Sequence, residues 1–164
     1  MYLMSARHLS VYLYDHRAGA IAAVELLKQL EQAHADAPIA AFASALRSDI
    51  EADIRELEAL MSRHGIAPSA VRNAGAWVTA KVAELKVRID DPGDGALRLL
   101  ETLEAVALGI DGKRALWNAL SAADDQMPTS SGVDYARLAA RAVTQREAVE
   151  KERLSAARAA LQAG

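Results

Sequence analysis

Apolar residues recur at every third or fourth position through four long stretches of this chain, and this spacing limits its fold more than any other feature. Such a repeat places the apolar side chains along one stripe of an α-helix. The four stripes, in chain order, consist of Leu9, Leu13, Ala20, Val24 and Leu27; Leu46, Ile50, Ile54, Leu57 and Met61; Leu99, Leu103, Val106, Ile110 and Trp117; and Leu138, Ala142, Val149, Ala156 and Ala160. Val and Ile do not gather into alternating runs, and aromatic residues make up only 4% of the chain. The sequence therefore predicts an all-α protein.

Segments rich in glycine, proline and short polar residues separate these stretches, and such residues favour turns. They divide the chain into four long helices and one short helix, and the chain of 164 residues has the length of one ordinary domain. The sequence thus predicts one domain over 1–164. The expected helices cover 5–33, 39–64, 74–89, 95–122 and 133–161.

Four long amphipathic helices with short first and last connections favour a four-helix bundle. The middle connection is different, because it contains the short expected helix at 74–89. At about 1.5 Å per residue, this helix would carry the chain most of the way back along the bundle. We therefore expect the second and third long helices to run parallel, in an up-down-down-up layout with an additional crossover helix.

Composition narrows the classes of function. The chain is 52% hydrophobic and 25% charged, with a net charge of -3 and with basic and acidic residues interspersed, so no basic patch favours nucleic acid. The absence of cysteine excludes disulfides and thiolate metal sites. No stretch approaches the roughly twenty apolar residues of a membrane span, and the start lacks the pattern of a signal peptide. We expect a cytoplasmic protein that binds neither nucleic acid nor membranes.

Three phrases, together with the long crossover, resemble the ferritin-like superfamily: "YLYDHRAGA", "RELEALMSRHGIAP" and "LEAVALGIDGKRAL". The nearest likeness is to the small stress-associated ferritin-like proteins of bacteria, whose crossover also contains a helix. The resemblance implies an up-down-down-up bundle. It also implies a di-iron or related site at mid-bundle, built from a Glu on two helices and a Glu-x-x-His pair on each of the other two.

Most of the ligands that this resemblance implies are missing. On the second long helix the family's Glu and His fall at Ile50 and Asp53, and on the fourth the inward candidate is Gln145. The only Glu-x-x-His pair in the chain, at 31–34, stands at the end of the first helix beside a turn. We therefore expect a degenerate di-metal site with no catalytic residue, no bound metal and no cofactor; iron or manganese is the alternative.

Several polar side chains nevertheless fall within or beside the apolar stripes. Burying an unpaired charge is costly, so these groups should pair with one another or reach the surface. In a hairpin of the first two helices, His16 and Asp53 would lie within about one turn of each other. The predicted buried polar network consists of His16, Asp53, Arg114, Gln145 and Glu152. If a metal binds instead, its candidate ligands are His16, Asp53, Glu104 and Glu152.

The first helix carries a second apolar track roughly opposite to its core stripe, formed by Val11, Tyr14, Ala18 and Ile21. The bundle core cannot cover both sides of one helix. The crossover helix, with Trp77, or a two-fold related partner must pack on this track. We expect both to contribute, which gives a homodimer formed through the first helix and the crossover helix.

Two functions follow from these observations. The first is a ferritin-like bundle without redox catalysis, which serves as a stress-related, binding or assembly protein. The alternative is a metal-binding ferritin-like oxidoreductase or storage protein with a nonstandard carboxylate site. A third hypothesis is a hydrophobic ligand held between the helices, which a pocket in the structure would support.

Overall fold

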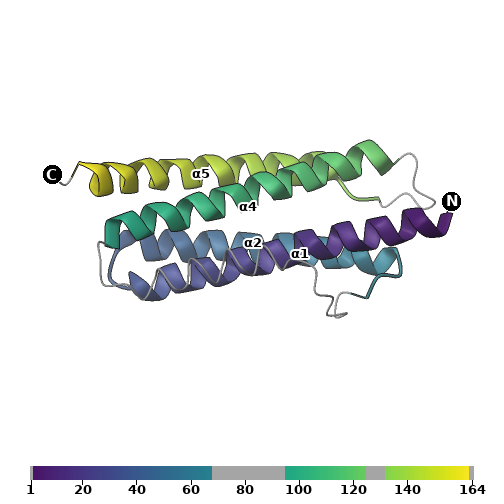
Figure 1. Ribbon diagram of the computed structural model, residues 1–164, viewed down its shortest axis with the longest axis horizontal. Coiled ribbons are helices and arrows are strands. Elements are labelled where there is room, and N and C mark those ends of the chain that lie inside the picture. The colour runs from purple at the N-terminus through teal and green to yellow at the C-terminus, as the bar shows by residue number, and fades with distance from the viewer. Residues whose placement is uncertain (1, 68–94, 125–131, 163–164) are drawn as a thin grey trace.

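The computed structural model describes residues 2–67, 95–124 and 132–162. Within these ranges the chain forms four α-helices and no strand, which confirms the all-α prediction. The helices are α1 (Tyr2–Ala33), α2 (Pro38–Arg63), α4 (Gly95–Ala123) and α5 (Tyr135–Leu161), shown in Figure 1. Their ends agree with the four long ranges expected from the sequence to within three residues. The short helix expected at 74–89 lies outside the described residues.

The ends of the helices follow from local residue chemistry. Proline at the start of α2 fits a first-turn position, where its missing N–H would have no partner in any case. After α2, Gly65 adopts a φ of 67°, and the N–H of Ile66 donates to the carbonyl of Met61 at 2.9 Å. This is a glycine-terminated helix end of the Schellman type. At the start of α5 the carboxylate of Asp134 accepts from the N–H of Arg137 at 2.9 Å and caps the helix.

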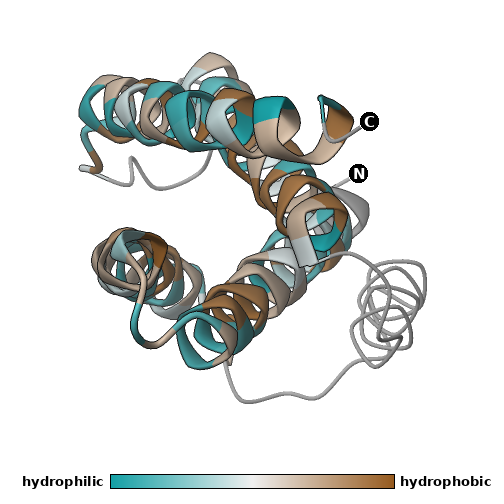
Figure 2. Ribbon diagram, turned by 90° about the vertical axis from the view of Figure 1, so that its left-hand side faces the viewer, coloured by the Kyte–Doolittle hydropathy of each residue, from teal (hydrophilic) through white to brown (hydrophobic). Residues whose placement is uncertain are grey.

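The helices form two antiparallel pairs. In Figure 1, α1 runs from right to left and α2 returns from left to right, while α4 and α5 repeat this change of direction in the opposite sense. The two pairs meet mainly through α1 and α4, and to a smaller extent through α2 and α5. Figure 2 looks along the bundle and shows that every helix carries both hydrophobic and hydrophilic residues, as amphipathic helices around a shared core must.

The hydrophobic interior is divided into two clusters along the length of the bundle. The turn-end cluster lies towards the α1–α2 turn and includes Leu27, Leu30, Leu46, Leu103 and Val149. The N-end cluster lies towards the N-terminus and includes Leu13, Leu60, Met61, Trp117 and Leu138. All of these side chains are buried, and only Leu30 and Leu46 retain a few per cent of exposed surface. The expected stripes therefore supply the core, and the polar residues of interest lie where the two clusters meet.

The second apolar track of α1 is buried at one position and exposed at others. Tyr14 is buried and its hydroxyl donates to the carbonyl of Ala67 at 2.7 Å. Val11 and Ile21 remain 39% and 43% exposed. The expected contact with Trp77 falls outside the described residues, and the homodimer remains a prediction. None of the described helices is long and apolar enough to cross a membrane.

Candidate functional site

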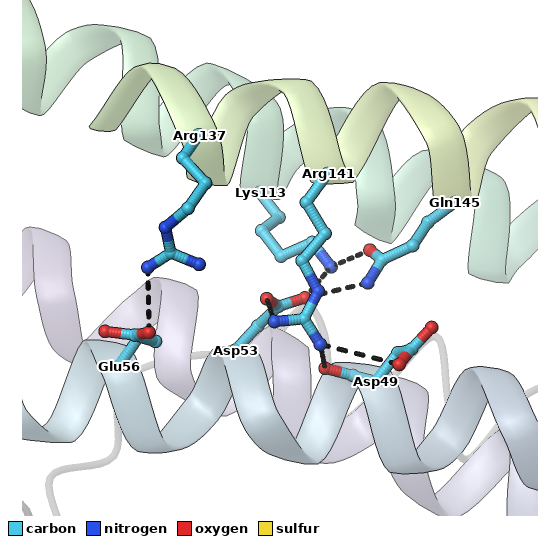
Figure 3. A network of polar contacts seen from close by, with 7 residues as sticks. All are labelled: Asp49, Asp53, Glu56, Lys113, Arg137, Arg141 and Gln145. Carbon is cyan, nitrogen blue, oxygen red and sulfur yellow. Dashed lines mark hydrogen bonds and ion pairs between the residues drawn. The ribbon is translucent and has the colours of Figure 1, made fainter. Parts of the chain in front are cut away.

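Asp53 lies at mid-length of α2 and is only 3% exposed, although its position belongs to an apolar stripe. One of its carboxylate oxygens, Oδ2, accepts a hydrogen bond from Nζ of Lys113 at 2.5 Å. The same oxygen accepts from Nε2 of Gln145 at 3.0 Å. Because Lys113 belongs to α4 and Gln145 to α5, a single carboxylate joins three helices in the interior (Figure 3).

Lys113 is the buried cation of this site. Its ammonium also donates to Oε1 of Gln145, so the amide is bonded to both charged partners. Burial lowers the pKa of Lys113, because the charged form loses its hydration, and the neighbouring Asp53 carboxylate opposes this change. The carboxylate of Asp53 thus favours the charged form of Lys113 in the interior.

The second carboxylate oxygen of Asp53 faces α5. Nη1 of Arg141 lies 3.3 Å from Oδ1 of Asp53, close enough for an ion pair but not aligned for a hydrogen bond. The other terminal nitrogen of Arg141 donates to the main-chain carbonyl of Asp49 at 3.1 Å. We call Asp53, Lys113, Arg141 and Gln145 the charge cluster. Both oxygens of its carboxylate are directed at protein cations.

The charge cluster results from matching faces of two helices. Residues three or four apart in a helix share a face. On α5 the residues of this face are Arg137, Arg141 and Gln145, and on α2 they are Asp49, Asp53 and Glu56. Arg137 pairs with Glu56 at 3.0 Å at the exposed edge of the site (Figure 3). A donor face on α5 therefore meets an acceptor face on α2.

The structure brings Asp53 and Gln145 together, as the predicted network requires, but not Arg114. The side chain of Arg114 is 47% exposed and lies 3.6 Å from Asp111 on its own helix. Its neighbour Lys113 takes the inward position instead. One residue corresponds to about 100° around a helix, and the rotation of α4 turns Lys113, which is 8% exposed, inward and Arg114 to the surface. The prediction of an inward Arg114 was wrong by this single position.

His16 is half-buried on α1, and its described contact is an edge-on ring contact with Tyr12, with the ring centroids 4.6 Å apart. Burial lowers the pKa of His16, and the charge of the adjacent Asp15 opposes this effect. His16 and Asp53 line the same cavity. The structure thus places them on a common wall, without a described hydrogen bond between them.

Glu104 and Glu152 lie away from the charge cluster. Glu104 is 49% exposed and pairs with Arg153 at 3.3 Å between α4 and α5. Glu152 is half-buried on α5, seven residues beyond Gln145, which is about 10 Å along the helix axis. The structure therefore does not gather the four candidate metal ligands around one point.

Other carboxylates are engaged by arginine, either within one helix or between two helices. Glu150 accepts from Arg153 at 2.6 Å and from Arg146 at 2.8 Å, and these bonds lower its pKa to about 2. Arg17 pairs with Glu58 at 2.7 Å between α1 and α2. In the same way Arg47 pairs at 3.2 Å with Glu31, the acid of the chain's only Glu-x-x-His pair. These acids act as partners of surface arginines.

Iron or manganese does not fit the charge cluster. These metals need several carboxylate or imidazole lone pairs directed at one point. Here the ammonium of Lys113, which has no lone pair, lies against one oxygen of Asp53, and the guanidinium of Arg141 faces the other. Among residues 2–67, 95–124 and 132–162, no group of three or more His, Asp or Glu side chains could hold a metal ion.

A cavity of about 500 Å³ adjoins the charge cluster between α1, α2 and α4. Asp53 and Lys113 form part of its wall, and Trp117 lies one turn further along α4. Most of the remaining lining is apolar, and several positions on α1 and α4 are Gly or Ala. The cavity therefore combines an apolar space with a few polar groups, as small-molecule sites do.

Comparison with protein-family models, with curated proteins and with solved structures gave no match for this chain.

Sequence reasoning missed two members of the charge cluster, Lys113 and Arg141. A signal for Arg141 was present, because it precedes the predicted inward Gln145 by four residues and so lies on the same face of the helix. Lys113 has the same kind of signal, since it stands three residues after Ile110 and four before Trp117. Arg114 has the complementary spacing, and periodicity alone does not separate the two.

Proposed function

We propose that this protein is a cytoplasmic, non-catalytic bundle of the ferritin-like type, in which protein cations replace the metal at mid-bundle and the interior serves to bind a small molecule. The observation that carries the proposal is the ammonium of Lys113, 2.5 Å from the buried carboxylate of Asp53. A stress-related role belongs to the same proposal, on the basis of the resemblance to bacterial stress-associated ferritin-like proteins.

The layout of the helices supports the ferritin-like part of the proposal. Figure 1 draws α2 and α4 in the same direction along the bundle, with α1 and α5 in the other direction. The connection from α2 to α4 extends over 64–94, whereas the connection from α1 to α2 covers only 34–37. A long connection is what a chain needs to begin two successive helices at the same end of a bundle.

The contacts of Asp53 with protein cations support the non-catalytic part. A carboxylate acts as a metal ligand or a general base only if an oxygen is free to meet the metal or the substrate proton. Lys113 and Gln145 bond to one oxygen of Asp53, and Arg141 faces the other. The residue that the resemblance to ferritin-like proteins places at a ligand position is thus engaged by side chains of the protein itself.

Metal analysis of the whole chain tests this proposal. We expect protein purified after growth with added iron and manganese to contain far less than one metal ion per chain and to be folded by circular dichroism. The matched variants are Asp53→Ala, which removes the buried carboxylate, and Asp49→Ala, which removes the exposed carboxylate one turn earlier. Near-stoichiometric metal that is lost in Asp53→Ala but kept in Asp49→Ala would establish the alternative, a carboxylate metal site in an oxidoreductase or storage protein.

We further propose a homodimer formed through α1. Val11 and Ile21 on this helix remain 39% and 43% exposed, although they belong to an apolar track. A two-fold related copy would cover such a track with the same surface of its own. Light scattering after size exclusion should give twice the chain mass, and Val11→Lys with Ile21→Lys should give the monomer mass. A monomer for the unsubstituted chain would refute the dimer.

A further inference from the structure

We propose that the cavity between α1, α2 and α4 binds a small monocarboxylic acid with an apolar body, such as a medium-chain fatty acid, and that Lys113 and Trp117 receive its carboxylate. The inference deepens the proposed function and rests on it in one respect, because Asp53 must be paired with Lys113 and not with a metal. It names the class of molecule that the bundle would bind.

The dimensions of the cavity suit a small ligand. Its volume of about 500 Å³ lies within the range typical of small-molecule sites. Gly19 and Gly112 lie in its wall, and a Cβ atom added at either position would meet no other atom within 4 Å. Leu108, also in the wall, is 73% exposed, so the cavity reaches the surface on the α4 side. An apolar body could therefore enter and be surrounded.

Two hydrogen-bond donors in the cavity wall are left without acceptors. An ammonium has three N–H donors, and the described bonds of Lys113 use two of them. Trp117 is 1% exposed, and its indole Nε1 has no hydrogen-bond partner. Buried donors are almost always paired in native proteins, so an unpaired one indicates a missing acceptor.

These donors are positioned to act together. Trp117 follows Lys113 by four residues, so both side chains lie on one face of α4, one turn apart. Both belong to the same cavity wall. A carboxylate has two oxygens that only accept hydrogen bonds, so it can satisfy one donor with each oxygen. An amine could satisfy neither of these donors; the second oxygen of Asp53, which lies in the same wall and accepts no described hydrogen bond, already faces the guanidinium of Arg141.

Of the charged groups that line the cavity, the ammonium of Lys113 is the one that favours an anion over a neutral acceptor, whereas Asp15 and Asp53 are carboxylates. Lys113 and Arg141 both lie against the carboxylate of Asp53. Arg141 also pairs with the exposed Asp49, so among the described residues the only carboxylate in direct contact with the ammonium is one that it shares. Burial lowers the pKa of Lys113, which agrees with incomplete compensation of its charge. His16 and Asp15 also line the cavity; burial lowers the pKa of His16, and Asp15 is exposed, where water and salt screen its repulsion.

Calorimetric titration with three probes of equal chain length tests the inference: decanoate, decanol and decylamine, each below its aggregation concentration. We expect decanoate to bind with a stoichiometry of one per chain. Decanol should bind at least about tenfold more weakly, because it brings no charge to Lys113. Decylamine should not bind. Equal binding of decanol and decanoate, or no binding of decanoate, would overturn the inference.

Two variants place the ligand in this cavity without disturbing the charge cluster. Gly112→Leu fills the open space, and we expect it to abolish decanoate binding. The control Ala119→Leu adds the same side chain at an exposed position of α4 and should bind as the unsubstituted chain does. Binding that survives in Gly112→Leu would place the ligand elsewhere and overturn the inference.

The indole gives a direct readout. In proton–nitrogen spectra, the Trp117 N–H signal, assigned from its loss in Trp117→Phe, should move on addition of decanoate, and Trp117→Phe should weaken binding about 3- to 10-fold. A Trp117 signal that does not move would contradict the proposed contact.

Metal content is measured on the same sample. Metal-free protein that does not bind decanoate refutes this inference alone, whereas metal lost on Asp53→Ala refutes the proposed function.

Discussion

The α1–α2 pair meets the α4–α5 pair along two seams that are chemically opposite. The α1–α4 seam contains small apolar residues, and a Cβ added at Gly109 would lie 4.0 Å from the Cβ of Ala23. The α2–α5 seam is described by charged contacts, among them Arg137 with Glu56 and Arg141 with Asp49. The charge cluster lies between the two seams, where Asp53 joins α2 to α4 and α5.

The difference between the seams shows how side-chain length sets the distance between helices. Gly and Ala allow two helix backbones to approach closely, whereas an arginine and a carboxylate bridge a wider gap through their long side chains. This agrees with the more extensive packing of α1 on α4 than of α2 on α5. Apolar burial then supplies most of the stability of the bundle, and the ionic seam specifies which residues face each other.

The largest effect is expected where the two seams meet. Asp53→Ala leaves the Lys113 ammonium buried without its carboxylate, and this should lower the free energy of unfolding by about 3 to 5 kcal/mol. Asp49→Ala removes a carboxylate that is 57% exposed, on the same helix. Its cost should be below about 1 kcal/mol. Urea denaturation of both variants gives the comparison, and equal losses would contradict a buried charge cluster.

Within the ionic seam, the loss of stability on replacing an arginine should depend on how deeply its partner carboxylate is buried. Arg141 faces the buried carboxylate of Asp53, so Arg141→Met should destabilise the protein by about 1 to 2 kcal/mol. Arg137 and its partner Glu56 are more exposed, and Arg137→Met should cost less than about 1 kcal/mol. Raising the salt concentration should reduce the loss for Arg137 more than the loss for Arg141. If Arg137→Met destabilised the protein more than Arg141→Met, the exposed ion pair of this seam would contribute more to stability than the buried one.

The apolar seam should instead accept additional atoms. Gly19 lies in a helix and faces open space, so Gly19→Ala should raise the free energy of unfolding by about 0.5 to 1 kcal/mol, because alanine is the better helix former. The change in thermal midpoint provides the measurement. Gly109→Ala is the matched variant at the close approach to Ala23, and its gain should be smaller. A clear loss of stability in Gly19→Ala would mean that the cavity is not open there.

The smallest expected effect is the contribution of His16, in the cavity wall, to the pH dependence of the free energy of unfolding. Because burial lowers its pKa below 6.5, the unfolded chain binds more protons than the folded chain between the two values. The free energy of unfolding should therefore rise with pH through the window that ends near 6.5, and fall as the solution is acidified through it. His16→Gln should lack this contribution while keeping the pH dependence of the carboxylates. Identical pH profiles would show that His16 is not buried in solution.

The sequence predicts the all-α class and the four long helices well, because the helical spacing of apolar residues is a local property of the chain. The stripe of α2 illustrates this, since Leu46, Ile50, Leu57 and Met61 are all buried. The packing of the helix pairs on each other is harder to predict from the sequence, because it depends on contacts between residues far apart in the chain. No local pattern indicates that charged contacts join α2 to α5 or that small residues lie between α1 and α4.

The candidate site is predictable only in part, for a related reason. Asp53 and Gln145 interrupt apolar stripes, so periodicity alone places them inside. Lys113 and Arg114 both stand at helical spacing from Ile110 and Trp117, and the choice between them depends on the rotation of α4 about its axis. Packing against α2 and α5 fixes this rotation. The cavity is also invisible to periodicity, because it results from side chains that do not fill the space between three helices.

A double-mutant cycle of Asp53→Asn and Lys113→Met tests the central claim most directly, because it measures how strongly the carboxylate and the ammonium depend on each other. Each single variant and the double variant are unfolded with urea, and the coupling energy follows from the four free energies. If Lys113 takes the place of a metal at Asp53, the coupling should be about 1 to 3 kcal/mol, with the double variant less destabilised than the sum of the single ones. A coupling near zero would contradict this account, because Asp53 would then be held in the interior by something other than Lys113.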